Sequence, residues 1–336
     1  MSLVLFELAN PKSKIQNPKL MDGVLNIDKP VGWTSHDVVA RVRRLLKEKR
    51  VGHTGTLDPF ATGVLVVMVG RATRLAQFLA GDAKEYLATV RFGYATDTGD
   101  VTGTRLAKDE RSEAIETRVR PWSETEIEAA LATLRGEIEQ VPPMYSAKKI
   151  AGQKLYEMAR RGLAVEREAR RVNVYEFEAV RQTDGELLRW NEDGTCDMLV
   201  RVLCSAGTYV RVLAESTGER LGVGAHLTSL RRTRAGEFRI KDAVTMEELE
   251  TKAAAGAAAN LLVSMDAALS GLAFVHLTAE AARRVSHGVP FRLKREEEAN
   301  YQEGERVRMM DESGTLLAVG AYDSRLEMVR PIVVLA

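Results

Sequence analysis

A short loop around Asp58 holds the densest group of side chains that could do chemistry. Residues 52–63 (GHTGTLDPFATG) are framed by glycines, and Pro59 keeps Asp58 out of the helical conformation. The loop leads into an apolar, β-branched run at 64–69, which predicts a buried strand. Catalytic groups are often carried on loops that a rigid scaffold holds in place, so Asp58 is a candidate nucleophile or base. The alternative is a purely structural Asx-turn at the Asp-Pro step.

A second segment offers an arginine and an aromatic ring together. Residues 204–211 (CSAGTYVR) end one predicted strand and begin a predicted helix. If Arg211 lies near Asp58, its charge keeps the carboxylate ionised and fixes its direction, as a nucleophile requires. Tyr209 and Tyr86 could sandwich a nucleobase, because stacking on an aromatic ring contributes about 1–3 kcal/mol per base. The residues alone therefore indicate a soluble enzyme with a carboxylate-centred site, without showing that the segments meet.

Other common catalytic motifs do not occur in the sequence. There is no Gly-rich phosphate loop followed by Lys-Ser/Thr, and no G-x-G-x-x-G follows a predicted strand. The five histidines and the two cysteines, Cys196 and Cys204, never reach a metal-ligand spacing, so we expect no metal and no cofactor. Cys204 is interpreted as a small core residue. The contiguous residues 35–37 (SHD) cannot converge as a triad and are interpreted as capping residues of a helix that follows Thr34.

The charge of the chain is balanced overall but segregated along the sequence. The 48 Lys and Arg residues nearly cancel the 47 Asp and Glu residues. Basic residues cluster at 41–50, 160–171 and 231–241, and acidic ones at 109–128 and 296–298. Any one of these basic clusters, taken alone, is best interpreted as a solvated helix face. The presence of three clusters favours a surface that binds a polyanion.

Length and composition indicate an ordinary globular protein. The chain has 336 residues, 45% hydrophobic and 28% charged, which suggests two domains or one large domain with an appendage. Its longest apolar run, 64–69, is too short to cross a bilayer. The N-terminus is a poor signal peptide because Glu7 interrupts the apolar stretch. With only two cysteines, we expect a soluble cytoplasmic protein.

Hydrophobic periodicity predicts the elements that must position these residues. Strands are expected at 23–27, 64–69, 86–92, 172–180 and 198–205. Helices are expected over 38–46 behind a Thr34 cap, and over 123–134, 155–161 and 209–221. An alanine-rich stretch at 253–259 is a candidate domain boundary. Beyond it, a small β-domain is indicated by strands at 274–277, 306–310, 316–321 and 326–334.

Taken together, these segments resemble the TruB family of pseudouridine synthases. The matching motifs follow one another in order between about residues 21 and 249, which makes chance a poor explanation. They are 26–35 (NIDKPVGWTS), 52–59 (GHTGTLDP), 84–86 (KEY), 93–103 (GYATDTGDVTG), 142–147 (PPMYSA) with 155–157 (LYE), 204–211 (CSAGTYVR), 224–227 (GAHL) and 230–232 (LRR). Residues 1–20 have no counterpart in this pattern, and Lys148 stands where the family usually has an apolar residue.

The resemblance implies an α+β fold, the pseudouridine synthase fold, with a mixed, largely antiparallel sheet and a small C-terminal PUA-like β-domain. It divides the chain into an N-terminal extension (1–20), a catalytic domain (21–271) and a PUA-like RNA-binding domain (272–336). Residues 105–170 resemble an insertion that grips the T arm. The implied activity is isomerisation of uridine 55 in the T arm of tRNA to pseudouridine. The implied partner is the tRNA T stem-loop, with no membrane, no obligate protein partner and a monomeric protein.

The resemblance also implies roles for individual residues. Asp58 matches the catalytic aspartate, which attacks the sugar or the base, or assists glycosidic cleavage, before the uracil turns and rejoins through carbon 5. The residues expected to bind substrate are Arg211 beside Asp58, Tyr86 stacked on the flipped base, Tyr209 and Leu230 lining its pocket, His53 filling the space left in the T loop, and Lys29 in the first motif. Unstacking a base costs a few kcal/mol, and aromatic stacking offsets that cost.

Two alternatives stay open. The first is the guide-RNA-dependent branch of the same superfamily, in which partner proteins and a guide select the uridine; the resemblance of residues 105–170 to the standalone insertion argues against it. The second is a non-catalytic protein that binds tRNA or assists its folding. That reading gives no reason for Asp58 to accompany Arg211 and Tyr86.

Overall fold

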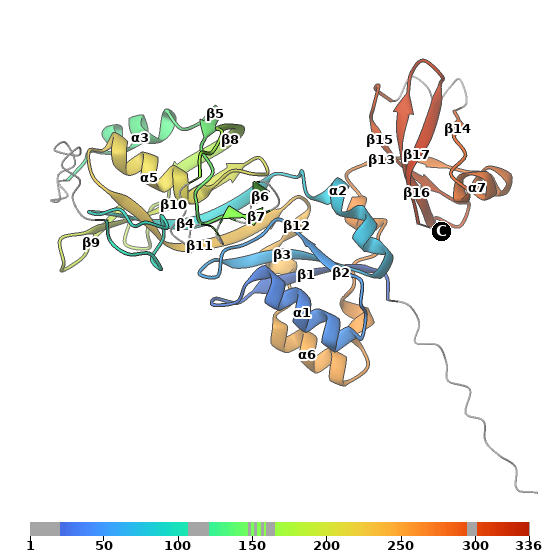
Figure 1. The fold of residues 1–336 in the computed structure, drawn as a ribbon, viewed down its shortest axis with the longest axis horizontal. Helices are drawn as coiled ribbons and strands as arrows, with labels where there is room; N and C mark the ends of the chain where they lie inside the picture. Colours follow the sequence, from blue (N-terminus) through green and yellow to red (C-terminus); the bar gives the residue numbers. More distant parts are fainter. Residues whose placement is uncertain are drawn as a thin grey trace, which may run out of the picture.

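The structure is a computed structural model that describes residues 21–106, 121–146, 149–150, 153–155, 158, 165–293 and 301–335. These residues form one large sheet with helices packed on it and a second, smaller sheet near the C-terminal end (Figure 1). The predicted helix at 155–161, the 160–171 basic cluster and the 105–170 insertion lie partly or largely outside the described residues. No helix in the described part of the chain is long and apolar enough to cross a membrane.

The large sheet has ten strands and is mixed but largely antiparallel, which confirms the predicted α+β fold class. Along the main path the order is β1 (Gly23–Lys29), β3 (Thr62–Val69), β11 (Ala225–Ala235), β4 (Lys84–Phe92), β10 (Cys196–Cys204), β8 (Arg170–Ala179) and β5 (Gly136–Gln140). Three short strands join it at the side, namely β2 (Val51–Thr54), β9 (Leu188–Trp190) and β12 (Phe238–Arg239). The two-residue strands β6 (Lys149–Ile150) and β7 (Gln153–Lys154) form a separate pair.

The two halves of this sheet meet at a short parallel ladder between β3 and β11. It registers Thr62 with Arg231 and Gly63 with Arg232, whereas the other neighbours on the main path are antiparallel. Gly63 has a φ of +100°, and a Cβ added there would lie 2.2 Å from the backbone oxygen of Arg232. Only glycine therefore lets the two backbones approach this closely.

Strand β3 is buried on both faces, which explains why its sequence is an unbroken apolar run. Leu65 and Val67 pack in a core with helices α1 (Ser35–Leu46) and α6 (Met246–Ala254). Val64 and Val66 point the other way, into a core that includes the C-terminal domain. Figure 1 shows α1 and α6 side by side beneath β1 and β3. The sequence correctly predicts α1, including the Thr34–Asp37 capping box.

The second half of the sheet is covered by α3 (Glu124–Ala132) and α5 (Val210–Arg220). Their apolar side chains pack against β4, β10 and β11, and Cys204 is buried in this core, as expected. The Ser123–Glu126 capping box predicted for α3 is present. On the opposite face of the sheet, Arg201 forms an ion pair with Glu176 at 2.5 Å. One face of this half is therefore apolar and the other charged.

The C-terminal sheet contains all four strands that the sequence predicts there. Its order is β13 (Ala273–His276), β15 (Arg306–Met310), β16 (Leu316–Asp323), β17 (Met328–Val334) and β14 (Phe291–Arg292), with helix α7 (Ala279–Ser286) beside it. The expected turn between β15 and β16 is closed by Asp311, whose Oδ1 accepts hydrogen bonds from the backbone N–H groups of Ser313 and Thr315, both at 2.9 Å. The sequence did not indicate β14 or α7.

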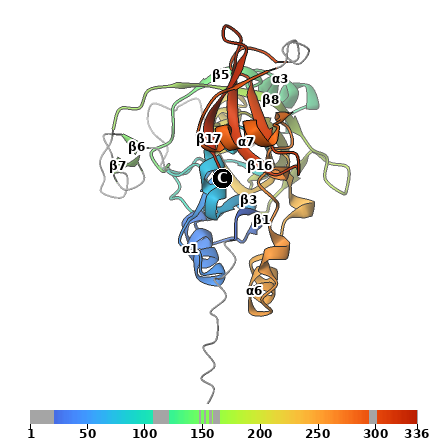
Figure 2. The same ribbon diagram turned by 90° about the vertical axis from the view of Figure 1, so that its right-hand side faces the viewer.

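The two sheets share one apolar core. Val319 and Leu335 of the C-terminal domain are buried with Leu75 and Phe238 of the large domain. The guanidinium of Arg71 donates a hydrogen bond to the backbone oxygen of Leu335 at 2.6 Å. Figure 2 views the molecule from this end, with the C-terminal sheet in front and α1 and α6 below. The C-terminal domain is thus packed onto the large domain by buried apolar side chains.

The alanine-rich stretch at 253–259 is not a boundary between the domains. Helix α6 runs through Ala254, and Ala258 packs in the core that β1, β3 and α1 form. A little further on, Val263 still bridges to Val24 of β1. This part of the chain therefore belongs to the large domain, and the second sheet begins later, at Ala273.

Because the core is shared, we expect a cavity made in the C-terminal domain to destabilise the large domain as well. Leu335→Ala removes a side chain that is 1% exposed and should cost about 2–4 kcal/mol. All three tryptophans, Trp33, Trp122 and Trp190, lie in the large domain, so their fluorescence during heating reports its unfolding. We expect the midpoint of that transition to fall by about 4 °C or more.

The matched control for this cavity is Ile332→Ala, which truncates an exposed residue of β17, the strand that Leu335 follows. It should leave the tryptophan transition nearly unchanged. An unchanged transition in Leu335→Ala as well would show that the two domains unfold independently.

Candidate active site

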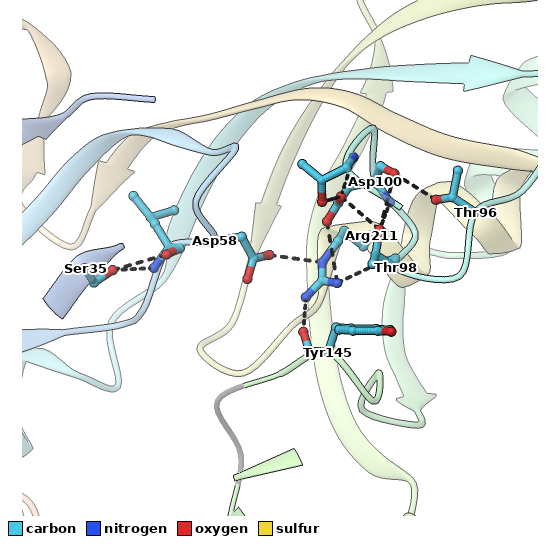
Figure 3. Close-up of polar contacts among 9 residues, drawn as sticks. Ser35, Asp58, Thr96, Thr98, Asp100, Tyr145 and Arg211 are labelled. Carbon is cyan, nitrogen blue, oxygen red and sulfur yellow. Dashed lines mark hydrogen bonds and ion pairs between the residues drawn. The ribbon is translucent and has the colours of Figure 1, made fainter. Parts of the chain in front are cut away.

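The loop that carries Asp58 is held from both sides. Buried Ser35, the first residue of α1, accepts a hydrogen bond from the backbone N–H of Leu57 at 2.9 Å and donates one to its carbonyl oxygen at 3.2 Å. The backbone N–H of Gly32 donates to the carbonyl oxygen of Pro59 at 2.8 Å. Asp58 lies between these anchors with its side chain 33% exposed. Figure 3 shows Ser35 and Asp58 on opposite sides of the loop.

These contacts correct two interpretations of the sequence. Ser35 was expected to cap α1, but Thr34 is the cap, and the Ser35 hydroxyl instead fixes the loop. Residues 52–63 were expected to be loop throughout, whereas their first three residues belong to strand β2, which pairs with β3. The loop before Asp58 is therefore shorter and more firmly held than the sequence suggests.

Arg211 forms an ion pair with Asp58, with 3.0 Å between Nε and Oδ2 (Figure 3). Its side chain is only 4% exposed. The remaining nitrogens donate to the backbone oxygens of Thr98 at 2.6 Å and Tyr145 at 2.7 Å. Since two further segments hold the guanidinium, its direction toward Asp58 is set before any ligand arrives. The structure thus brings together the two residues that the sequence placed far apart.

A second carboxylate, that of Asp100, lies on the other side of Arg211. Its Oδ2 is 3.7 Å from Nη1 of Arg211. Oδ1 accepts hydrogen bonds from the Thr98 hydroxyl and the Thr102 backbone N–H, both at 2.9 Å. Figure 3 shows this cluster above Arg211. The sequence included Asp100 only within a family motif and gave it no role.

Burial and neighbouring charges set the protonation of these groups. The protein around Asp58 shields its carboxyl from water and raises its pKa, Arg211 opposes this effect, and Asp100 raises the pKa further. Lys29 lies beneath the loop, where its Nζ donates to the backbone oxygens of Pro30 at 2.9 Å and Trp33 at 2.6 Å. Burial lowers the pKa of Lys29 to about 8, while Asp58 acts to raise it.

A cavity of about 330 Å³ opens on one side of Asp58 and contains five of the seven predicted site residues. Asp58 and Arg211 form part of its wall, and the rings of Tyr86 and Tyr209 and the side chain of Leu230 complete it. The backbone of Tyr209 is fixed by Gln140, whose Oε1 accepts its N–H at 2.9 Å. The lining thus combines aromatic and apolar side chains with charged ones, and the Asp58 carboxylate is among them.

Two predicted site residues lie outside this cavity. Lys29 supports the Asp58 loop from below. His53 lies in β2, and its ring contacts that of His36 edge to face, with centroids 5.6 Å apart. Within the described part of the chain, the buried Nδ1 of His53 has no hydrogen-bond partner. Burial lowers the pKa of His53 to about 4, so the ring is neutral at pH 7. The substrate roles of Lys29 and His53 stay predictions.

The third basic cluster of the sequence is partly internal. Arg232 was grouped with an exposed basic face, but it is fully buried and lines the cavity. Its neighbour Arg231 forms an ion pair with Asp28 at 2.7 Å. In the first cluster, Arg41 forms an ion pair with Glu250 at 2.7 Å. Fewer free cations therefore reach the surface than the sequence implies.

The described site holds a carboxylate paired with a fixed arginine, beside a cavity that two tyrosines help to line. Such a carboxylate can act as a nucleophile or a base on a ring bound in the cavity, and aromatic walls are suited to stack a nucleobase. The contacts around Asp58 also exclude the Asx-turn as a complete account, since its side chain is directed to Arg211. The arrangement is suited to an active site.

Comparison with known proteins agrees with this geometry. Residues 43–210 match the N-terminal domain of the TruB family pseudouridylate synthases, and residues 211–270 match the tRNA pseudouridylate synthase B C-terminal domain. The chain is 47% identical over 276 residues to tRNA pseudouridine synthase B of Geobacillus thermodenitrificans, covering 81% of this chain and 86% of that protein. It is 40% identical to the synthase B of Bacillus cytotoxicus, covering 94% and 97%.

Solved structures give the same result for the fold. The chain resembles one in a Cbf5-Nop10-Gar1 complex with a TM-score of 0.68 and 28% identity, covering 94% of this chain and 86% of that one. It also resembles one in an H/ACA RNP bound to a substrate RNA containing 2′-deoxyuridine, with a TM-score of 0.67 and 26% identity, covering 94% and 86%.

We expect the pKa of Asp58 to rise when the guanidinium is removed, because Arg211 is the cation that most opposes its protonation. The test is a carbon-13 NMR titration of carboxyl groups in the wild type and in Arg211→Met, with Asp58→Asn used to assign the signal. Arg231→Met removes an arginine paired with Asp28 and should leave the Asp58 titration in place. An unchanged midpoint in Arg211→Met would contradict the electrostatic role of the ion pair.

Proposed function

This chain belongs to the TruB family of pseudouridylate synthases, and from that membership we propose that it isomerises uridine 55 in the T arm of tRNA to pseudouridine. The observation that carries the proposal is the ion pair of Asp58 with Arg211 at the edge of a cavity walled by Tyr86, Tyr209 and Leu230. These are the positions at which the family resemblance of the sequence implies catalytic and base-binding residues.

The proposed substrate is supported by the relatives. Those named tRNA pseudouridine synthase B are 40–48% identical to this chain and cover 80–94% of it. Identity at this level over most of the chain favours the same substrate class. The position within tRNA, uridine 55, rests on the family motifs and on the resemblance of residues 105–170 to a T-arm-gripping insertion.

The reaction requires the target base to leave its stack. A base inside a structured loop is out of reach of a side chain, and extruding it costs a few kcal/mol. In our proposal the flipped uracil enters the 330 Å³ cavity, where Tyr86 and Tyr209 offset that cost by stacking. The bond from C1′ to N1 then breaks, the ring turns, a bond from C1′ to C5 forms, and the hydrogen lost from C5 is balanced by one gained at N1.

Asp58 is proposed to act as the nucleophile. It attacks either the sugar at C1′ or the ring, or it assists cleavage of the glycosidic bond; the geometry is compatible with each route. All of them need an ionised carboxylate at the edge of the base. Arg211 favours the ionised form because its charge opposes the rise in pKa that burial causes, and its hydrogen bonds to the backbone oxygens of Thr98 and Tyr145 keep it in place.

A standalone enzyme is favoured over the guide-RNA-dependent branch. The matching chains in the Cbf5 complexes and in the H/ACA RNP are 26–28% identical to this one, whereas the synthase B relatives are 40–48% identical. We therefore propose a monomer that acts on tRNA in the cytoplasm without an obligate protein partner. A non-catalytic tRNA-folding role does not explain why Arg211 is fixed against Asp58.

The first test is release of tritium from a T-arm RNA that carries 5-tritiated uridine at the target position, with purified protein alone. Formation of the bond to C5 displaces the label into water. We expect release by the wild type and a loss of at least about 10⁴-fold in Asp58→Asn, because a neutral amide cannot act as the nucleophile. RNA binding should persist in the variant.

Asp28→Asn is the matched control, since it removes a carboxylate paired with Arg231 rather than with Arg211. It should retain most of the activity. Tritium release by Asp58→Asn would show that Asp58 is not the nucleophile. No release by the wild type, with RNA binding intact, would favour the guide-dependent or folding alternatives.

A second prediction concerns Tyr86, which is 9% exposed and lines the cavity. Tyr86→Leu keeps an apolar side chain but removes the ring, so single-turnover activity should fall about 5- to 150-fold, the equivalent of 1–3 kcal/mol of stacking. Tyr86→Phe keeps the ring and should lose less activity. If thermal stability fell as much as activity in Tyr86→Leu, the residue would be part of the core only.

A further inference from the structure

Two buried cations face the cavity that the proposed function assigns to the target base, and the steps described above use neither. Lys84, the first residue of β4, is 4% exposed, and Arg232 of β11 is 1% exposed. Both line the cavity together with Tyr86 and Leu230. The sequence placed Lys84 in a family motif and Arg232 in a basic cluster, without assigning either to the chemistry.

Both cations donate hydrogen bonds to backbone carbonyls, and Arg232 also interacts with the Tyr86 hydroxyl. Nζ of Lys84 donates to the oxygen of Ala80 at 2.7 Å and to that of Asp82. Arg232 donates from Nε to Val64 at 2.6 Å and from Nη2 to Gly55 at 3.0 Å. Among the described residues, no carboxylate lies within ion-pair distance of either cation. Each keeps N–H groups beyond those that the carbonyls accept.

The cavity therefore carries positive charge that no ion pair among the described residues neutralises; the carboxylate of Asp82 acts on Lys84 only from beyond ion-pair distance. Burial of an unpaired cation is costly, and proteins rarely retain one without compensation. The cost is visible at Lys84, where burial lowers the pKa to about 8. Asp58 does not balance these cations, because it is already paired with Arg211. A ligand that becomes negative inside the cavity would supply the missing compensation.

The proposed reaction produces negative charge at this place. When the bond between C1′ and N1 breaks, its electron pair stays with the uracil and spreads over N1, O2 and O4. If Asp58 instead adds to the ring, the displaced electrons move through C5 and C4 to O4. The pair is used again when C5 bonds to C1′, after which C5 loses its hydrogen and N1 gains one. Each route places transient negative charge on the pyrimidine.

We infer that Lys84 and Arg232 stabilise the negative charge that develops on the uracil ring while it is detached from the sugar. This inference rests on the proposed function and adds a role that the Asp58–Arg211 pair does not fill. Cations fixed in a site that excludes water stabilise a developing charge far better than water does, because they need not reorganise. Arg232 also contacts the Asp58 loop through Gly55, so Lys84 is the cleaner residue to test.

The test compares two leaving groups in single-turnover reactions on T-arm RNA, one with uridine and one with 5-fluorouridine at the target position. Fluorine withdraws electrons and stabilises the detached 5-fluorouracil anion. Cleavage of the bond from C1′ to N1 therefore depends less on cations of the protein with this substrate than with uridine. Conversion of uridine is followed by pseudouridine formation, and that of 5-fluorouridine by its disappearance from nuclease digests. We expect Lys84→Met to lower the rate of uridine conversion about 10²-fold. The rate of 5-fluorouridine conversion should fall by a factor that is at least about tenfold smaller.

Two control variants separate charge from packing. Lys84→Arg keeps the charge and should keep the wild-type ratio of the two rates, even if both rates fall. Arg308→Met removes a buried arginine of the C-terminal domain, paired with Asp266 at 2.7 Å, and should also leave the ratio unchanged. If circular dichroism shows that Lys84→Met does not fold, Lys84→Gln replaces it.

Equal slowing of both substrates in a folded Lys84→Met would overturn the inference and leave Lys84 a packing role. The same would follow if Lys84→Arg changed the ratio as much as Lys84→Met did. Failure of the wild type to convert uridine would instead refute the proposed function, so the two failures are distinguishable.

Discussion

The close approach of two backbones at Gly63 determines how the rest of the site is arranged. Strand β3 leaves the Asp58 loop and pairs with β11 through only two registered positions. A side chain at Gly63 would collide with the backbone of Arg232. Because this contact joins the two halves of the sheet, it brings the Asp58 loop, which belongs to one half, opposite Arg211, which begins a helix on the other. The ion pair is thus a product of sheet topology.

The carboxylates of the site and two of its cations lie on different sides of the cavity. Arg211 is shared by the carboxylates of Asp58 and Asp100. It also opposes the rise in pKa that burial causes at Glu215, one turn along α5, whose pKa reaches about 7. On the other side of Asp58, Lys84 and Arg232 donate to backbone carbonyls and form no ion pair among the described residues. The cavity therefore lies between a region rich in carboxylates and one rich in cations, and a base bound there would feel both.

The sequence predicted best what depends on neighbouring residues. The capping box at Thr34 is set by residues three apart, and the apolar run of β3 reflects burial of both faces, so both were found correctly. The pairing of Asp58 with Arg211 came from the family resemblance, because no periodicity relates residues so distant in the chain.

The incorrect predictions all concern contacts between residues that are distant in the sequence. Ser35 was interpreted as a capping residue, yet its hydroxyl contacts Leu57, which only the folded chain brings near. Arg232 was counted in a basic face because a cluster of arginines in sequence does not reveal which of them the sheet buries. Strand β2 was missed because its four residues gain their structure from pairing with β3 rather than from their own pattern.

The burial of β3 on both faces also bears on how the protein is made. One of these faces is covered by residues near 319 and 335, which a ribosome synthesises long after Asp58. Until strand β17 has been translated and has emerged, the core on this face of β3 lacks part of its apolar side chains. The nascent chain therefore completes the core behind the Asp58 loop late, and this incomplete core is where we expect a chaperone or a protease to act.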